Sequence, residues 1–415
     1  MTTAQARELL DSLFRLALDR VHGHTCVSRY LLANPLRGPV ATVAIGKAAA
    51  AMTAGAAEVL QAALVSGLVV SPAGQADIDV TVGANITLLF AEHPVPGPGS
   101  IAAGQALLAF ISELPADCRL LFLISGGASS LVEVPVEGIG LAELERVNRW
   151  LLGSGFDIAQ TNRVRTVLSR IKGGQLRAYL GAREACVLLL SDVPTNDVGI
   201  IGSGLLHPAA GPAGVLPVLP GWLSSLLPVR VEVDTPLPDV EHHIVATNHD
   251  ALAAIVEAAA QRGHHAVINT EPLTGDVHAA AGRIIEYLKT APPGLYLWGG
   301  ETTVVLPDMP GDGGRNQQLA LAVALQLAAT ALPVVLLAAG TDGRDGNSVA
   351  AGAIIDAESV QRGEQHGLHA RAALASADAG TFLAASGDRL LTGPSGTNVM
   401  DIVIALKQSR DMYDN

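Results

Sequence analysis

Residues 120–131, Leu120-Leu121-Phe122-Leu123-Ile124-Ser125-Gly126-Gly127-Ala128-Ser129-Ser130-Leu131, decide how the rest of the chain is interpreted. The first five residues form a short apolar run, which is typical of a strand buried on both faces of a parallel sheet. Small residues follow, and a helix is expected to begin at about Ala128. Glycines let a ligand approach the main chain closely, and the first N–H groups of a helix attract anions. The stretch predicts a strand–turn–helix unit with a phosphate or carboxylate cradle; the alternative is a tight turn that binds nothing.

Length and composition favour an α/β protein with two domains. The chain has 415 residues, of which 49% are hydrophobic and only 3% aromatic, and it contains 44 glycines. Its core must therefore consist mostly of Ala, Val, Leu and Ile, and small residues let helices lie close on a sheet. A chain of this length is comfortable for two domains. The proline-rich residues 205–241 indicate a connecting segment, and strand–helix alternation resumes after it.

Charge and cysteine usage argue against several classes of protein. The net charge is −13 without a basic stripe, so a nucleic-acid partner is not expected. Three widely spaced cysteines without a Cys-x-x-Cys pair argue against a disulfide framework and a zinc site, and they fit a reducing cytosol. Charged residues interrupt the apolar pattern of the N-terminus, unlike a signal peptide. The apolar residues 319–339 divide better into a helix and a buried strand than into a membrane span. A cytoplasmic protein without a membrane partner is expected.

Polar residues follow predicted strands in the first half of the chain. Lys47 comes after Gly46 and strand 40–45, and Asp192 follows strand 185–190. Open α/β sheets bind ligands at such strand ends. Lys47 lacks the context of a Walker lysine, and an ordinary surface lysine is the alternative. Asp192 suits Mg²⁺, with helix capping as its competing role. The basic residues 161–174, which include Lys172, indicate either a functional cluster or a solvated helix face.

The second half carries three polar clusters at predicted element boundaries, residues 299–317, 339–346 and 392–398. They contain Glu301, Arg315, Asp342 and Asn398. Gly and Asp are common in turns for backbone reasons, so one cluster alone would mean little. Three clusters, after a first half with the same pattern, predict a polar cleft between two α/β domains.

Taken in order, these motifs resemble the glycerate 2-kinases, the class II glycerate kinases with a MOFRL-type C-terminal region. Several members have been labelled hydroxypyruvate reductases. The resemblance covers nearly the whole chain and rests on an ordered set of motifs: Ile45-Gly46-Lys47, His93-Pro94-Val95-Pro96, Ile124-Ser125-Gly126-Gly127, Ser169-Arg170-Ile171-Lys172-Gly173-Gly174, Ser191-Asp192-Val193, Gly299-Gly300-Glu301-Thr302-Thr303, Gly314-Arg315-Asn316-Gln317, Gly340-Thr341-Asp342-Gly343 and Gly393-Pro394.

The resemblance implies a fold and a reaction. It implies a Rossmann-like N-terminal domain with a mainly parallel sheet over residues 1–235, a MOFRL-type α/β domain over residues 236–415, and an active site in the cleft between them. It also implies phosphorylation of D-glycerate to 2-phosphoglycerate, dependent on ATP and Mg²⁺, by a monomer or homodimer.

The resemblance also implies roles for individual residues. Lys47 and Arg315 would hold the glycerate carboxylate and the transferring phosphoryl group, and Asp342 would take the hydroxyl proton or hold Mg²⁺. Such roles suit phosphoryl transfer, in which catalysis is mostly alignment and charge stabilisation. Supporting ligands would be Glu301 and Asn398 for the substrate and Asp192 for the metal. The nucleotide-binding residues would be Ser125, Gly126, Gly127, Ala128, Ser129, Ser130 and Lys172.

The chain departs from the family pattern chiefly at two places, and three other functions compete. Asn347-Ser348-Val349 stands where the family usually continues Pro-Thr-acid, and Pro194-Thr195-Asn196-Asp197 stands where it tends to show Gly-Asp-Asp. A hydroxypyruvate reductase would need a Gly-x-Gly-x-x-Gly turn, whose spacing residues 125–130 lack. A serine hydrolase would need a closing glycine that residues 127–131 lack. A non-catalytic binder of nucleotides or organic acids is supported only by the two departures.

Overall fold

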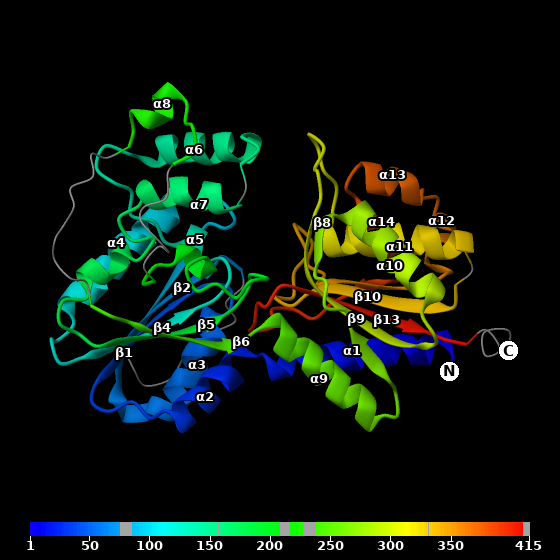
Figure 1. Ribbon diagram of the computed structural model, residues 1–415, viewed down its shortest axis with the longest axis horizontal. Helices are drawn as coiled ribbons and strands as arrows, with labels where there is room; N and C mark the ends of the chain where they lie inside the picture. Colours follow the sequence, from blue (N-terminus) through cyan, green and yellow to red (C-terminus); the bar gives the residue numbers. More distant parts are fainter. Residues whose placement is uncertain (75–84, 157, 208–215, 228–237, 331, 410–415) are drawn as a thin grey trace. The chain divides into compact units, whose positions relative to one another are not determined.

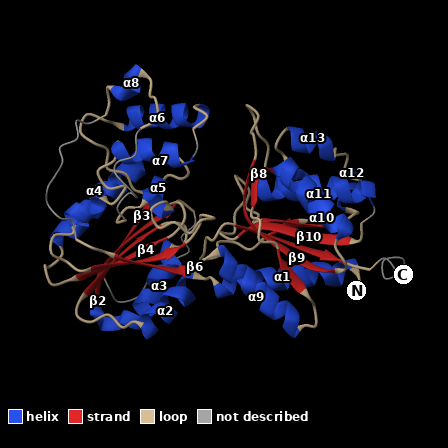
Figure 2. Cartoon of the chain, in the orientation of Figure 1, coloured by secondary structure: helices blue, strands red, loops and turns tan. Residues whose placement is uncertain are grey.

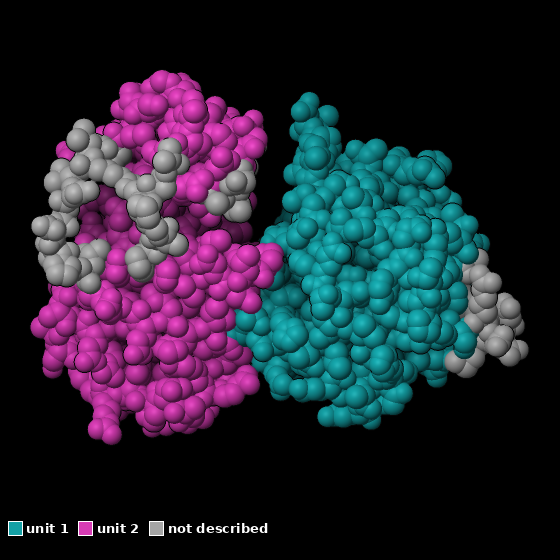
Figure 3. Space-filling model, viewed as in Figure 1, with its two compact units in different colours: residues 1–22, 246–415 teal, residues 23–245 magenta. Residues whose placement is uncertain are grey.

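The computed structural model describes residues 1–74, 85–156, 158–207, 216–227, 238–330 and 332–409. The chain forms two compact units (Figure 3). Gly23–Val245 makes up what we name the first unit, and Met1–His22 together with Ala246–Asn415 makes up the second unit. The chain passes from the first unit to the second after residue 245, whereas the sequence led us to expect the boundary after residue 235. In addition, residues 1–22 belong to the same unit as the C-terminal half of the chain.

The N-terminal helix α1 (Thr3–Arg20) explains this discontinuous division. Thr2 and Gln5 form a capping box at its start, and Leu10, Leu13 and Phe14 are among its buried residues. That apolar face packs on strands of the second unit. Arg7 also reaches across to Asp356 and Asp388, each at 2.8 Å. The sequence predicted the helix correctly, but helical periodicity cannot show which unit covers its apolar face.

The first unit contains a six-stranded sheet in the order β3-β2-β1-β4-β5-β6. Neighbouring strands from β3 to β5 are parallel. This order is that of doubly wound Rossmann folds, so the predicted Rossmann-like fold with a mainly parallel sheet is confirmed. The strands are β1 (Val40–Ile45), β2 (Leu64–Pro72), β3 (Asn85–Ala91), β4 (Arg119–Ile124), β5 (Ala185–Leu190) and β6 (Glu241–Ala246).

Helices cover both faces of this sheet (Figure 1). Helix α3 packs on β1 and β2 with α2 against it, and α4 packs on β2 and β3 from the other side. The helices are α2 (Gly23–Ala33), α3 (Ala49–Leu60), α4 (Pro98–Glu113), α5 (Ala128–Leu131), α6 (Leu141–Gly153), α7 (Ile158–Val167) and α8 (Gly221–Ser224), with 3₁₀ turns η1 (Gln61–Ala63), η2 (Gln175–Tyr179) and η3 (Ile201–Ser203). Helices α6, α7 and α8 share a small apolar core that contains Val147, Leu168 and Leu223.

The second unit is built on a mixed sheet in the order β12-β11-β10-β13-β9-β7, with β8 also paired to β9. Pairs from β12 to β9 are antiparallel, whereas β7 and β8 run parallel to β9. The predicted second α/β domain is therefore confirmed. The strands are β7 (Ala266–Ile268), β8 (Leu273–Asp276), β9 (Gly294–Thr303), β10 (Val334–Gly340), β11 (Gly352–Ile355), β12 (Arg389–Leu390) and β13 (Asp401–Lys407).

Helices again lie on both faces of the second sheet (Figure 2). Helices α1 and α9 pack together on one side, and α10 and α11 pack together on the other. The remaining bounds are α9 (Asn248–Gln261), α10 (Val277–Thr290), α11 (Arg315–Thr330), α12 (Ser359–Glu364), α13 (Ala370–Ala375) and α14 (Ala379–Ala385). Residues 319–339 divide between α11 and the buried strand β10, as predicted. None of the helices in the described ranges combines the length and the apolar character needed to cross a membrane.

Candidate active site

The turns after β1 and β4 meet where the strand order of the first sheet reverses. Strand β2 lies on one side of β1 and β4 on the other. The Lys47 N–H donates to the Gly126 carbonyl at 3.0 Å, and the Ala48 N–H donates to Ser125 Oγ at 3.0 Å. Ligands of doubly wound sheets bind outside the carboxyl ends of the strands at such a reversal. The predicted cradle therefore lies at the place where this fold binds ligands.

Glycine is required at two positions of these turns. Gly46 has a φ of +130°, and a Cβ there would lie 2.6 Å from the Ser125 carbonyl oxygen. Gly127 has a φ of +88°, and its Cβ would lie 2.9 Å from His93 Cδ2. Both values fall where side chains are disfavoured. The two glycines therefore let the turns lie close together and let the His93 ring pack against the main chain at residue 127.

The serines of the predicted phosphate loop serve the protein's own structure. Ser125 is buried and accepts the Ala48 N–H, and Ser130 donates to the Gly127 carbonyl at 3.0 Å. Ser129 Oγ lies 2.5 Å from Ser203 Oγ. The structure thus gives each of these hydroxyl groups a partner within the chain.

The backbone of the same loop has open donors. Among the described residues, no acceptor meets the N–H groups of Gly126, Gly127 and Ser129. Helix α5 does begin at Ala128 as predicted, but it ends after four residues. Such a short helix has little dipole, so the expectation that the start of a helix attracts the anion is corrected. What remains is a group of converging N–H donors, which can hold an anion without a long helix.

Asp192, predicted as a metal ligand, has an oxygen atom that lacks a partner. It follows β5, which is the neighbour of β4. Asp192 Oδ1 is shielded from solvent and has no hydrogen-bond partner in the described part of the chain. Burial raises the pKa of Asp192, while a backbone hydrogen bond and the charge of Lys47 oppose that rise. Such a carboxylate is suited to a cation, which would satisfy the orphaned oxygen.

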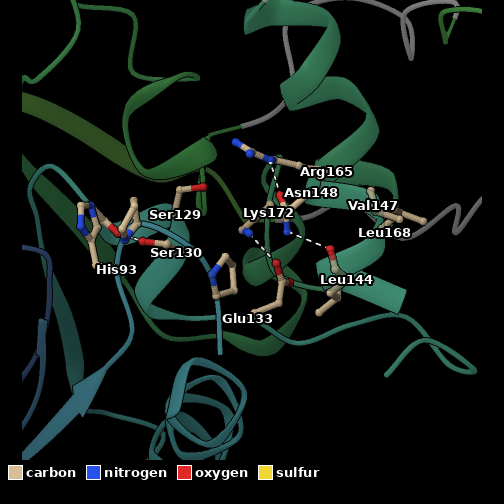
Figure 4. A pocket seen from close by; sticks show the side chains of 13 residues that line it. His93, Ser129, Ser130, Glu133, Leu144, Val147, Asn148, Arg165, Leu168 and Lys172 are labelled. Atoms are coloured by element: carbon tan, nitrogen blue, oxygen red, sulfur yellow. Dashed lines mark hydrogen bonds and ion pairs between the residues drawn. The ribbon is translucent and has the colours of Figure 1, made fainter. Parts of the chain in front are cut away.

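Lys172, predicted to contact the nucleotide, lies in a cavity of about 160 Å³ (Figure 4). Its side chain is 2% exposed and forms an ion pair with Glu133, which is 4% exposed. Arg165 and Asn148 also line the cavity, and Arg165 Nε donates to Asn148 Oδ1 at 3.0 Å. The basic stretch that contains Arg165 and Lys172 therefore contributes cations to an internal cavity, in addition to exposed residues such as Arg170.

In the second unit, carboxylates surround Arg315. Its Nε and Nη2 atoms bind the two oxygens of Asp401 at 2.6 and 3.0 Å, and its Nη1 binds Glu301 at 2.7 Å. Burial alone would lower the pKa of Arg315, but Asp401 and Glu301 raise it above its ordinary value. Three of the five guanidinium donors are thereby used. The side chain remains 35% exposed, so the other donors can still meet a ligand.

Asp342 and Asn398 lie beside this arginine cluster. A Cβ built on Gly340 would lie 3.2 Å from Asp342 Oδ1 and 3.4 Å from Asp401 Oδ1, so the two carboxylates flank the same backbone position. Asn398 is 8% exposed and precedes Val399, whose N–H donates to Thr341 Oγ1 at 2.8 Å. The structure thus brings Arg315, Glu301, Asp342 and Asn398 together within the second unit. Lys47, Asp192 and the 125–130 loop come together within the first.

The comparisons with known proteins agree with this architecture. A family described as a domain of unknown function (DUF4147) matches residues 9–219, and the MOFRL family matches residues 294–401. A D-glycerate 2-kinase of Thermotoga maritima is 34% identical over 381 residues, which is 88% of this chain and 90% of the relative. The chain belongs to the glycerate 2-kinase family.

Further relatives support membership of the glycerate 2-kinase family and explain its mixed names. A protein of Agrobacterium vitis, provisionally named a hydroxypyruvate reductase, is 36% identical over 418 residues, or 96% of this chain and 93% of the relative. The solved structure of a glycerate kinase from Thermotoga maritima matches with a TM-score of 0.81 at 30% identity and covers 98% of this chain and 100% of that chain. The resemblance stated from the motifs is thereby confirmed.

Sequence reasoning missed several residues around the candidate site of this glycerate 2-kinase family member. Asp401 lies outside the three polar clusters of the sequence, and it begins β13, so its carboxylate lies at the strand end. Asp345 was assigned to a turn, but it is 2% exposed and accepts the N–H groups of Asn316 and Gln317 at the start of α11. Its position in the 339–346 cluster was the only available signal.

A mixed group of possible metal ligands also went unnoticed. The three cysteines, all within the described ranges, are buried and form no disulfide. However, Cys186 of β5 has its sulfur within 4.8 Å of ligand atoms of Glu241 and His243 on β6. Cysteine spacing alone could not show this, because strand pairing brings the three residues together.

Proposed function

We propose that this protein transfers the γ-phosphoryl group of ATP to the 2-hydroxyl group of D-glycerate with the aid of Mg²⁺. The observation that carries the proposal is the convergence, at the reversal of strand order, of a glycine turn with open N–H donors, Lys47 and Asp192. Phosphoryl transfer depends on alignment and on stabilising the charge of the phosphoryl oxygens. Backbone donors, a mobile cation and a metal-binding carboxylate supply both requirements.

The nucleotide phosphates fit the turn after β4. The N–H groups of Gly126, Gly127 and Ser129 would donate to phosphate oxygens. Lys47 lies near Gly127, since a Cβ on that glycine would be 3.6 Å from Lys47 Cγ. Its ammonium group is a compact point charge suited to a phosphoryl oxygen.

Mg²⁺ fits the chemistry of Asp192. Mg²⁺ binds through one or two carboxylates together with phosphate oxygens, and it neutralises phosphate charge when bound. The unpartnered Oδ1 of Asp192 offers such a carboxylate oxygen. Burial raises the pKa of Asp192. A bound cation would lower this pKa again toward its ordinary value, so the carboxylate would stay ionised.

In the second unit, we assign Arg315 to the substrate carboxylate or the phosphoryl group, and Asp342 to the hydroxyl group or the metal. Arg315 keeps two guanidinium donors for a carboxylate or phosphoryl group, while Asp401 and Glu301 hold its plane fixed. Asp342 would accept the hydroxyl proton or bind the metal. Glu301 and Asn398 would contact the substrate through their polar groups.

The names given to some relatives point to a reductase, but the first strand does not favour it. In dinucleotide-binding Rossmann folds the turn after β1 reads Gly-x-Gly-x-x-Gly. Here β1 is followed by Gly46-Lys47-Ala48-Ala49-Ala50-Ala51. The second and third glycines are missing, so that turn lacks the signature for binding the pyrophosphate of NAD.

The test is an assay of ADP release with D-glycerate and a panel of small hydroxy acids, followed by ³¹P NMR of the product. We expect D-glycerate-dependent ADP release and 2-phosphoglycerate. Lys47→Met should lower kcat more than it changes KM for glycerate, because charge on the transferring group grows in the transition state. Lys289→Met, a change at an exposed lysine of α10, is the matched control. Asp192→Asn should raise the Mg²⁺ concentration needed for activity.

Two results would overturn the proposal. One is NADH-dependent reduction of hydroxypyruvate without any glycerate-dependent ADP release. The other is an unchanged rate and Mg²⁺ requirement in both the Lys47→Met and the Asp192→Asn variant, with circular dichroism showing that both are folded.

A further inference from the structure

The cavity of the first unit has one more positive than negative group. Its charged lining residues are Arg165, Lys172 and Glu133. The Glu133 carboxylate is occupied by Lys172, with both side chains almost fully buried. Arg165 instead has a neutral amide partner, Asn148, and forms no ion pair within the described residues. Burial lowers the pKa of the Arg165 guanidinium, and Glu133 opposes this only in part. An anion in the cavity would remove that electrostatic cost.

The size of the cavity restricts what that anion can be. Its volume is about 160 Å³. Sites for drug-sized ligands are about 300–1,000 Å³, so this cavity suits a smaller ligand. Leu144, Val147 and Leu168 line the side of the cavity away from Ser129 and Ser130 (Figure 4). A small organic acid of about three carbons matches both the volume and the charge.

The cavity also touches the turn assigned to the phosphates. Gly127 and Ser129 belong both to the cavity lining and to the group of open N–H donors. Figure 4 shows the nitrogen atoms of Arg165 directed toward the side on which Ser129 lies. A small acid whose carboxylate is held at Arg165 would therefore have its hydroxyl groups toward the turn.

We propose that this cavity binds the acceptor hydroxy acid, with Arg165 gripping its carboxylate and Lys172 supporting the same charge. The assignment rests on the proposed function and changes two roles within it. Lys172 becomes an acceptor-site residue rather than a nucleotide contact, and Arg165 rather than Arg315 holds the acceptor carboxylate, which leaves Arg315 for the phosphoryl group. A guanidinium can bind a carboxylate through two parallel hydrogen bonds. The Arg165 Nε–H···Asn148 bond fixes the plane of the guanidinium and leaves its terminal nitrogens for the ligand.

The experiment measures binding of D-glycerate, glycolate and L-lactate by calorimetry without nucleotide, and binding of MgADP separately. Arg165→Met should weaken binding of the acids by about 10- to 100-fold, the scale of lost charge-assisted contacts, and leave MgADP affinity unchanged. Arg163→Met is the matched control, because Arg163 is exposed on the same helix α7 and does not line the cavity. Leu168→Phe tests the volume independently, since the larger ring should exclude the acids without changing charge.

The outcomes separate this inference from the proposed function. If glycerate-dependent ADP release occurs but Arg165→Met leaves acid affinity and KM for glycerate unchanged, the cavity is not the acceptor site and the kinase assignment stands. If Arg165→Met weakens MgADP as much as the acids, the cavity belongs to the nucleotide. If the parent protein binds none of the acids, the inference is overturned. If it binds them through Arg165 but releases no ADP, the site stands and the kinase assignment fails.

Discussion

Glu133→Gln should destabilise the first unit by about 3–5 kcal/mol, because it leaves the Lys172 ammonium buried without a counter-charge. The two side chains are 4% and 2% exposed, so bulk solvent screens the remaining ammonium charge only weakly. Two unit charges about 3 Å apart attract by about 5 kcal/mol at an effective dielectric of ~20, which agrees with that range. Glutamine keeps the shape and can still accept the Val134 N–H, which now meets Glu133 Oε1 at 3.0 Å. The expected loss is therefore one of charge rather than packing.

The assay is urea unfolding followed by tryptophan fluorescence. Trp150 and Trp222 pack edge to face at 6.3 Å within the first unit, and Trp298, in the second unit, would be replaced by Phe in all variants. The matched control is Glu184→Gln, which breaks the Arg119 ion pair whose side chains are 28% and 73% exposed. That change should cost no more than about 1 kcal/mol.

A double variant makes the reasoning refutable. Glu133→Gln with Lys172→Met removes both charges, so it should recover most of the stability lost in the single variant. Two results would contradict the argument: a Glu133→Gln protein as stable as the Glu184→Gln control, or a double variant no more stable than Glu133→Gln alone.

Three further predictions concern other buried groups. Burial raises the pKa of Asp345 to about 6, so the stability contributed by its protonated form is present below pH ~4 and is lost as pH rises through 6. Relative to Asp345→Asn, the parent's free energy of unfolding should fall by about 2 kcal/mol between pH 4 and pH 7 in urea titrations. Burial and the charge of Glu241 raise the pKa of Cys186 to about 11, so iodoacetamide at pH 8 should label this thiol about 100-fold more slowly than an ordinary one, as mass spectrometry can measure. Arg7→Met removes one of the arginines that bind the buried Asp356, and Trp298 fluorescence should show a loss of about 2–3 kcal/mol in the second unit. An unchanged pH profile, rapid labelling or unaltered unfolding would each contradict the corresponding prediction.

The central strands of the first unit could be predicted from sequence because they are apolar on both faces. The run 40–45 is predicted and observed with the same bounds, and all six residues are buried. The run 185–190 likewise matches β5. Parallel strands covered by helices on both sides leave this continuous apolar signal. The packing of α1 on the second unit left no such signal, because an apolar helix face does not identify its partner.

The candidate site was predictable to the extent that it follows from strand ends. Lys47 and Asp192 could be placed because residues after parallel strands gather at one edge of a sheet. The partners of Arg315 could not be predicted from the sequence. Asp401 lies near Arg315 because of the register in which β13 pairs with β9 and β10, and the sequence does not give that register. Arg165 was visible as part of a basic stretch, but helical periodicity cannot distinguish a cavity wall from a solvated face.

The pairing of charges suggests how an acidic protein selects an anionic substrate. With a net charge of −13, the chain supplies carboxylates to most of its candidate cations. Lys172 is paired with Glu133, and Arg315 with Asp401 and Glu301. These cations are nearly neutralised before any ligand arrives, so they contribute fixed geometry more than net attraction. Arg165 instead has an amide as its hydrogen-bond partner, so a small carboxylate gains most at that position. Asn148→Asp should therefore neutralise Arg165 and weaken acid binding while leaving MgADP binding unchanged. An acid affinity equal to that of the parent would show that the net charge of the cavity does not select the ligand.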